Sequence, residues 1–215
     1  MARRTLVIDL NRCSGCDSCT VACKYENNIQ LGSFWNRVLA VGPTGEYPNI
    51  EMYWLPMQCQ QCENSPCVGV CPTGASYRDP ENNVVMVNKE LCIGCQYCMY
   101  ACPYGVRQFN EAEGVVEKCT LCNHLTAKSD GIENINDSFD EEHAVPPCVH
   151  NCCCGARYYG DLDDPNSAAS KALAAAGGEG SENVHTISDP SGAKPTVRYI
   201  LNPSVAQWKE LDSWK

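Results

Sequence analysis

Cysteine spacing constrains this chain more than any other feature. Eighteen of its 215 residues are cysteine, close to the density at which cysteine chemistry rather than an apolar core decides a fold. Sixteen of them form four groups: Cys13, Cys16, Cys19 and Cys23; Cys59, Cys62, Cys67 and Cys71; Cys92, Cys95, Cys98 and Cys102; and Cys119, Cys122, Cys148 and Cys152. Disulfide frameworks of small exported domains have irregular spacings, so this regularity indicates metal ligands.

The groups that start at Cys13 and Cys92 both have the spacing C-x2-C-x2-C-x3-C. This spacing holds 4Fe-4S clusters: three thiolates bind one cluster, and the fourth cysteine binds the other cluster of a pair. A zinc ribbon needs only two C-x2-C pairs, and disulfides do not need neighbours packed so closely. The spacing therefore favours iron–sulfur clusters over zinc and over disulfides.

Two internal repeats connect the four groups. The segments VIDLNRCSGCDSCTVAC and MVNKELCIGCQYCMYAC share an apolar pair, a loop glycine and an alanine before the last cysteine, so each is expected to form a strand, a cysteine loop and a helical turn. The segments PCVGVCPTGA and PCVHNCCCGA align without a gap. In this alignment Cys152 takes the ligand position of Cys71, whereas Cys153 and Cys154 stand where the other segment has proline and threonine.

The cross-ligation rule predicts which cysteines share a cluster. The predicted ligand sets are Cys13, Cys16, Cys19 and Cys152 for cluster A; Cys23, Cys119, Cys122 and Cys148 for cluster B; Cys59, Cys62, Cys67 and Cys102 for cluster C; and Cys71, Cys92, Cys95 and Cys98 for cluster D. The expected cofactors are thus four 4Fe-4S clusters. No Ser-His-Asp set, phosphate loop or paired carboxylates stand out, so no catalytic residue is predicted.

The expected fold class is α+β and loop-rich, with two interleaved modules like bacterial two-cluster ferredoxins, related by internal duplication. The expected division is an outer module (1–58 plus 110–160), an inserted module (59–109) and a C-terminal extension (161–215). The extension should contain a short helix, with Asp164 as N-cap and Pro165 in its first position, and a strand that returns to the core. The acidic stretch between Cys122 and Cys148 is expected to be a solvated loop.

Charge and hydropathy exclude several functions. The formal net charge of −10 argues against a nucleic-acid partner, which needs a basic surface. No apolar stretch approaches the roughly 20 residues of a membrane span. The paired Arg3 and Arg4 lack the apolar segment of an export signal. We therefore expect a soluble, uncleaved chain.

The motifs resemble those of a known family across residues 5–165. The phrases VIDLNRCSGCDSCTVACK, CQQCENSPCVGVCPTGA, CIGCQYCMYACPYGVR, EKCTLCNHL and GDLDDP are similar to those of the four-cluster iron–sulfur subunits of molybdenum or tungsten oxidoreductases in the dimethyl sulfoxide reductase superfamily. One departure is the pair Cys153 and Cys154, where the family has proline and a small residue. We expect both to be small buried side chains beside a cluster; redox sensing or an extra ligand is the alternative.

The resemblance implies an electron-transfer subunit that is not an enzyme on its own. It would relay electrons between a large molybdopterin catalytic subunit and a membrane quinone-reactive subunit or a soluble donor. The alternatives are a free-standing polyferredoxin and, from another class, a zinc-stabilised interaction module. The resemblance also favours a membrane-associated complex on the extracytoplasmic side, reached by export with a signal-bearing partner, over a cytoplasmic location.

Overall fold

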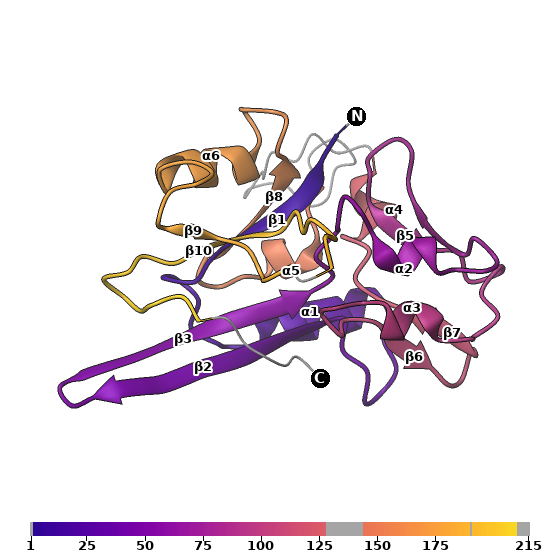
Figure 1. The fold of residues 1–215 in the computed structure, drawn as a ribbon, viewed down its shortest axis with the longest axis horizontal. Helices are drawn as coiled ribbons and strands as arrows, with labels where there is room; N and C mark the ends of the chain where they lie inside the picture. Colours follow the sequence, from indigo (N-terminus) through magenta and orange to yellow (C-terminus); the bar gives the residue numbers. More distant parts are fainter. Residues whose placement is uncertain (1, 128–143, 190, 210–215) are drawn as a thin grey trace.

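The computed structural model describes residues 2–127, 144–189 and 191–209. Within them, short helices and small sheets are joined by long loops (Figure 1). The fold is therefore loop-rich and α+β. Most of the predicted acidic loop, residues 128–143, lies outside the described residues.

A four-stranded sheet contains the N-terminal strand. Its order is β8 (Arg157–Asp161), β1 (Arg4–Asp9), β10 (Arg198–Ile200) and β9 (Val184–His185). Strand β1 pairs antiparallel with β8 and parallel with β10, so the C-terminal segment returns to the first strand. Leu6, Val7 and Ile8 are fully buried because both faces of β1 are covered. Val7 packs against Ala169 of helix α6 (Ala168–Ala175), whereas Leu6 and Ile8 belong to the cysteine-rich core.

A long hairpin projects from this body (Figure 1). It consists of β2 (Asn36–Glu46) and β3 (Asn49–Gln58), paired antiparallel with an irregularity between Val41 and Thr44. Its tip is exposed, but its base is buried, and Asn36 lies opposite Gln58 in the register there. The base of the hairpin thus places the buried amide side chains of Asn36 and Gln58 in the core.

Two short hairpins accompany the middle cysteine groups. They are β4 (Ser76–Arg78) with β5 (Val85–Val87), and β6 (Gln108–Asn110) with β7 (Val115–Glu117). Strand β5 precedes the group that starts at Cys92, as β1 precedes the group that starts at Cys13. The strand expected before each of these two runs is therefore present.

The helices are short and most carry cysteines. Their bounds are α1 (Ser18–Glu26), α2 (Pro66–Gly69), α3 (Tyr97–Tyr100), α4 (Asn123–Thr126), α5 (Pro147–His150) and α6 (Ala168–Ala175). Asp17 before α1 and Gln96 before α3 have left-handed φ values of 59° and 63°, so the chain turns sharply into both helices. In the described part of the chain, no helix has the length and apolar character needed to cross a membrane.

Helix α6 begins three residues later than the sequence predicts. Ser167, not Asp164, is the N-cap, because its side-chain oxygen accepts a hydrogen bond from the backbone N–H of Ser170. Asp164 instead accepts from the backbone N–H of Asn166 and closes the preceding turn. Pro165 lies in that turn, so the predicted roles of both Asp164 and Pro165 were wrong.

The core is built around cysteine side chains. The largest apolar cluster includes cysteines from all four groups together with Leu6, Trp35 and Tyr199. Because those thiols occupy the centre of the fold, whatever they bind is also part of the core.

Candidate cluster sites

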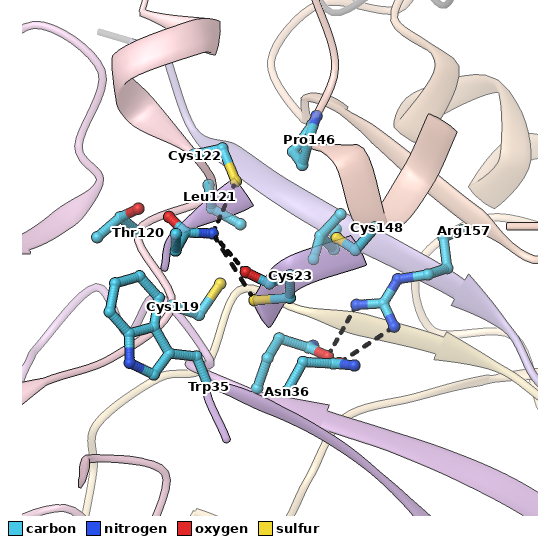
Figure 2. A pocket seen from close by; sticks show the side chains of 13 residues that line it. Cys23, Trp35, Asn36, Cys119, Thr120, Leu121, Cys122, Pro146, Cys148 and Arg157 are labelled. Carbon is cyan, nitrogen blue, oxygen red and sulfur yellow. Dashed lines mark hydrogen bonds between the residues drawn. The ribbon is translucent and has the colours of Figure 1, made fainter. Parts of the chain in front are cut away.

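The first site lies where α1, α5 and the turn before α4 meet. Cys23 comes from α1, Cys148 from α5, and Cys119 and Cys122 from the segment before α4; all four line one cavity. Figure 2 shows their side chains around the same hollow. These are the cysteines predicted for cluster B, and the cavity is called site B below.

A second cavity brings together the cysteines predicted for cluster A. Its lining includes Cys13, Cys16, Cys19 and Cys152. Glycine is required in this loop, because Gly15 has φ +70° and an added Cβ would lie 2.3 Å from the Trp54 ring. The cavity is called site A.

The cysteines of the predicted sets C and D are called sites C and D, and the structure brings part of each set together. Burial raises the pKa of Cys62. Three nearby thiols raise it further: Cys59, Cys67 and Cys102. In the predicted set D, Cys71 is among the thiols that raise the pKa of Cys98, after the larger effect of burial. Cys92 packs against the apolar cluster that contains Cys98, and Cys95 is exposed.

The four sites differ in exposure. All four cysteines are buried in site B and in site C. In sites A and D, one cysteine is buried, two are half-buried and one, Cys16 or Cys95, is exposed. Two sites are thus enclosed by the fold and two open to its surface.

The sites follow one another in a row. Among the groups that shift the pKa of Cys148, after burial and Arg157, is Cys19 of site A. Burial and then Cys148 raise the pKa of Cys119, and Cys59 of site C comes next. Cys67 of site C in turn acts on Cys98 of site D. The packing gives the same neighbours: Arg157 lines both site A and site B, cysteines of sites B and C share one apolar cluster, and Cys67 of site C shares another with Cys98 of site D.

The donor set fits 4Fe-4S clusters. Burial raises the pKa of Cys23, and Cys119, Cys148 and Cys122 raise it further. Thiolates packed this closely need a cationic centre, and metal coordination deprotonates a thiol. Within the described ranges, no three His, Cys, Asp or Glu side chains are grouped to hold a single metal ion. A cubane makes a different demand, because each of its four irons takes its own thiolate.

Side-chain amides donate hydrogen bonds to the sulfurs. Asn36 Nδ2 lies 3.2 Å from the Cys19 Sγ, and Asn27 Nδ2 lies 3.7 Å from the Cys122 Sγ. Such bonds to sulfur are one determinant of cluster potential. Neither asparagine was predicted, because both stand outside the cysteine motifs.

Two buried arginines were also missed. Arg157 lines both site A and site B, and Arg107 lies beside thiols of sites C and D. Each follows a cysteine by five positions, in the segments CPYGVR and CCCGAR. This shared spacing was the signal that could have revealed them.

Cys153 departs from its expected place. It is exposed rather than buried, and its Sγ lies 3.4 Å from the Cys16 Sγ. Cys154 is half-buried, lines site A, and has its Sγ 3.2 Å from the Ser14 Oγ. Pro72 and Thr73, at the equivalent positions after Cys71, are also exposed. The turn after the last cysteine therefore points these side chains outward in both segments, and the expectation of two buried side chains was wrong.

Comparison with known proteins also indicates 4Fe-4S clusters. Residues 50–162 match the family described as "4Fe-4S dicluster domain". The chain is 40% identical to a putative dimethyl sulfoxide reductase iron–sulfur subunit of Halobacterium salinarum, over 93% of this chain and 79% of that protein. It is 39% identical to a sulfite dehydrogenase subunit of Allochromatium vinosum, over 93% of this chain and 83% of that protein.

A third relative is a tetrathionate reductase subunit of Salmonella typhimurium, 34% identical over 92% of this chain and 72% of that protein. These relatives favour an electron-transfer subunit over a free-standing polyferredoxin or a zinc-stabilised module. The chain therefore belongs to the 4Fe-4S dicluster family of iron–sulfur electron-transfer subunits of molybdenum oxidoreductase complexes.

Proposed function

We propose that the chain carries four 4Fe-4S clusters, one in each of sites A to D, and relays electrons along them. The observation that carries the proposal is the row of thiol sets with exposed ends and an enclosed middle. A bound 4Fe-4S cluster supplies a redox couple whose potential depends on charge, hydrogen bonds and exposure. Sites A and D would exchange electrons with partners, and sites B and C would connect them.

The chain's own residues hold, insulate and adjust the sites. In sites B and C, the buried ligands keep water away from the sulfur atoms. In sites A and B, Asn36 and Asn27 donate hydrogen bonds to cysteine sulfurs. Water exclusion should lower the reduction potential of a bound cluster, because a dry site disfavours the negative charge that reduction adds. An N–H donor should raise that potential, because it stabilises the added charge.

We further propose that the two pairs of sites arose by duplication and form interleaved ferredoxin-like modules. The backbone supports this at aligned positions. Gly15 and Gly94 have φ +70° and +67°, and Gly74 and Gly155 have φ +68° and +53°. The division into 1–58 plus 110–160, 59–109 and 161–215 follows from the same repeat.

The chain has a catalytic partner subunit, and we propose that this partner is a large molybdopterin protein. A membrane quinone-reactive subunit or a soluble donor would take the other end of the row. The named relatives suggest three compounds to assay with the complex: dimethyl sulfoxide, sulfite and tetrathionate. We propose an extracytoplasmic complex exported with a signal-bearing partner, for which cell fractionation is the test.

Interrupting the row tests the relay. Cys122→Ser in site B is introduced into the native complex, and turnover is measured with the physiological membrane donor and with a small viologen dye. The relay predicts that donor-linked turnover falls to background, while the dye still supports turnover at the catalytic subunit. Unchanged donor-linked turnover in a complex that has lost the site B signal would overturn the proposal.

A further inference from the structure

Arg157 and Arg107 occupy equivalent places in the two pairs of sites. Arg157 begins β8 and contributes to the lining of both site A and site B. Figure 2 shows its side chain reaching toward the site B hollow, beside Cys148. Arg107 lies between α3 and β6, and its Nη2 donates to Ser76 Oγ, while the backbone N–H of Ser76 donates to Cys71 Sγ of site D at 3.3 Å. The thiols whose charge acts on its guanidinium belong to site C, at Cys67 and Cys59, and to site D, at Cys98. Each arginine therefore faces two thiol sets at once.

Both guanidinium groups are enclosed, with 3% of each residue exposed. Arg157 donates to Asn36 Oδ1 at 3.2 Å and to Gln58 Oε1 at 3.1 Å. Arg107 donates to Ser76 Oγ at 2.7 Å. All three acceptors are neutral, so these three hydrogen bonds leave the positive charges uncompensated.

Each arginine also has a buried N–H group that lacks a hydrogen-bond partner. Arg157 Nε and Arg107 Nη1 are buried without a hydrogen-bond partner, which is costly for a polar group. Among the residues that the structure describes, no carboxylate forms an ion pair with either arginine. Arginine cannot lose its charge in a protein, so the anionic thiolates and sulfides of the two flanking clusters are the available counter-charge.

Cluster binding would turn the thiols around each arginine into thiolates. Burial opposes the charge on Arg157, but negative charge on Cys148, Cys19 and Cys119 favours it and raises the pKa of Arg157. Burial likewise opposes the charge on Arg107, and negative charge on Cys67, Cys98 and Cys59 raises its pKa. By the same attraction, each arginine favours negative charge on the clusters beside it.

We propose that Arg157 and Arg107 are potential-setting residues, each shared by two clusters: Arg157 by A and B, and Arg107 by C and D. The inference rests on the four-cluster relay proposed above. Reduction adds negative charge to a cluster, and a buried cation stabilises the reduced form. One cation between two clusters raises both potentials together and weakens the repulsion between two added electrons. Neither arginine is a ligand; both act through charge and N–H donors.

The test is a redox titration of the cluster-loaded complex, followed by electron paramagnetic resonance. Arg157→Met removes the charge at similar side-chain length. It should lower the potentials of two signals, each by at least about a tenfold change in the reduced-to-oxidised ratio, or about 59 mV for a one-electron couple. Arg107→Met should lower the other two signals. Arg157→Lys and Arg107→Lys, which keep the charge, should retain most of the native potential.

Two further variants cover the case in which the methionine variants do not fold. Gln58→Glu and Ser76→Asp keep each arginine but place a carboxylate on it, and should lower the same two signals as the corresponding methionine variant. Arg198→Met is the control: this arginine pairs with Glu179 at the edge of β10, and its loss should move no signal.

The outcome that overturns the proposal is specific. It fails if the variants for Arg157 and Arg107 shift the same signals, shift all four equally, or shift none while the iron content stays native. A wild-type complex with fewer than four signals would instead contradict the four-cluster relay. The two failures are therefore distinguishable.

Discussion

The middle and the ends of the row of sites differ in one respect. Every cysteine of sites B and C is buried, whereas sites A and D each expose one cysteine, Cys16 or Cys95. Chemically the thiol sets are alike, so the difference lies in what the fold packs around them. The cysteines of the middle sites are enclosed by the fold, and each end site has one cysteine that a partner protein can reach. In the relay proposed above, the middle sites would therefore contribute more to stability and the end sites would exchange electrons with partners.

The largest effect should come from removing an inner ligand. Cys119→Ala in site B should reduce soluble, iron-loaded protein by more than about tenfold, because cluster binding is coupled to folding. Cys95→Ala in site D should cost at most one cluster and leave the far-ultraviolet circular dichroism native. Yield, iron per chain and circular dichroism are measured for both. Equal losses in the two variants would erase the distinction between middle and ends.

The next largest effect should come from removing a ligand of an end site, and it should be confined to that site. Cys152→Ser should abolish or alter the cluster A signal alone, because its partners Cys13, Cys16 and Cys19 are distant in sequence but line the same cavity. Cys153→Ala and Cys154→Ala are the matched controls and should keep every signal. Electron paramagnetic resonance of the reduced protein counts the centres. Loss of a centre in Cys153→Ala but not in Cys152→Ser would show that the ligand assignment is shifted by one residue.

Mild oxidation should separate the two classes of site without mutation. Ferricyanide reaches exposed clusters first, so iron release to a chelator should occur in two phases, with about half in the fast phase. The fast phase should coincide with loss of two of the paramagnetic signals. Release of all the iron in one phase would mean that the exposure of the ligands does not determine how fast a cluster is oxidised.

The smallest effect concerns the loop glycines. Gly15→Ala should lower the free energy of unfolding by at least about 2 kcal/mol, because the left-handed φ disfavours alanine and the methyl group meets Trp54. Gly74→Ala, with nothing within 4 Å of the added methyl group, should lower it by only about 1 kcal/mol. Denaturant unfolding of the loaded protein measures both. Equal values would mean that the Trp54 contact does not constrain the site A loop.

Cysteine spacing allowed much of the site to be predicted. Ligand spacing depends on local backbone geometry, so the strands before Cys13 and Cys92 and the helical turns after them could be expected from the repeat. The third cysteine of each run lies in a short helix, as at Cys19 and Cys98. Such features are encoded within about fifteen residues, where sequence is most informative.

The buried polar partners were missed because they depend on contacts between distant segments. The β2–β3 hairpin brings Asn36 to Arg157, a separation of 121 residues, and no local pattern records that contact. The start of α6 was misplaced for a local reason. Asp164 and Ser167 are both good N-caps, and Ser167 Oγ also donates a hydrogen bond to the backbone oxygen of Asp161, which selects Ser167. The exposure of Cys153 follows from the path of the chain after Cys152, which the alignment alone does not specify.

Iron content tests the central claim most directly. The four ligand sets predict about sixteen irons per chain and a matching amount of acid-labile sulfide in anaerobically purified protein, with little zinc. The count is made by metal analysis of the native complex and corrected for the partner subunits, each of which is also measured alone. A value near eight would mean that only one pair of sites holds clusters, and would contradict the row of four on which the relay depends.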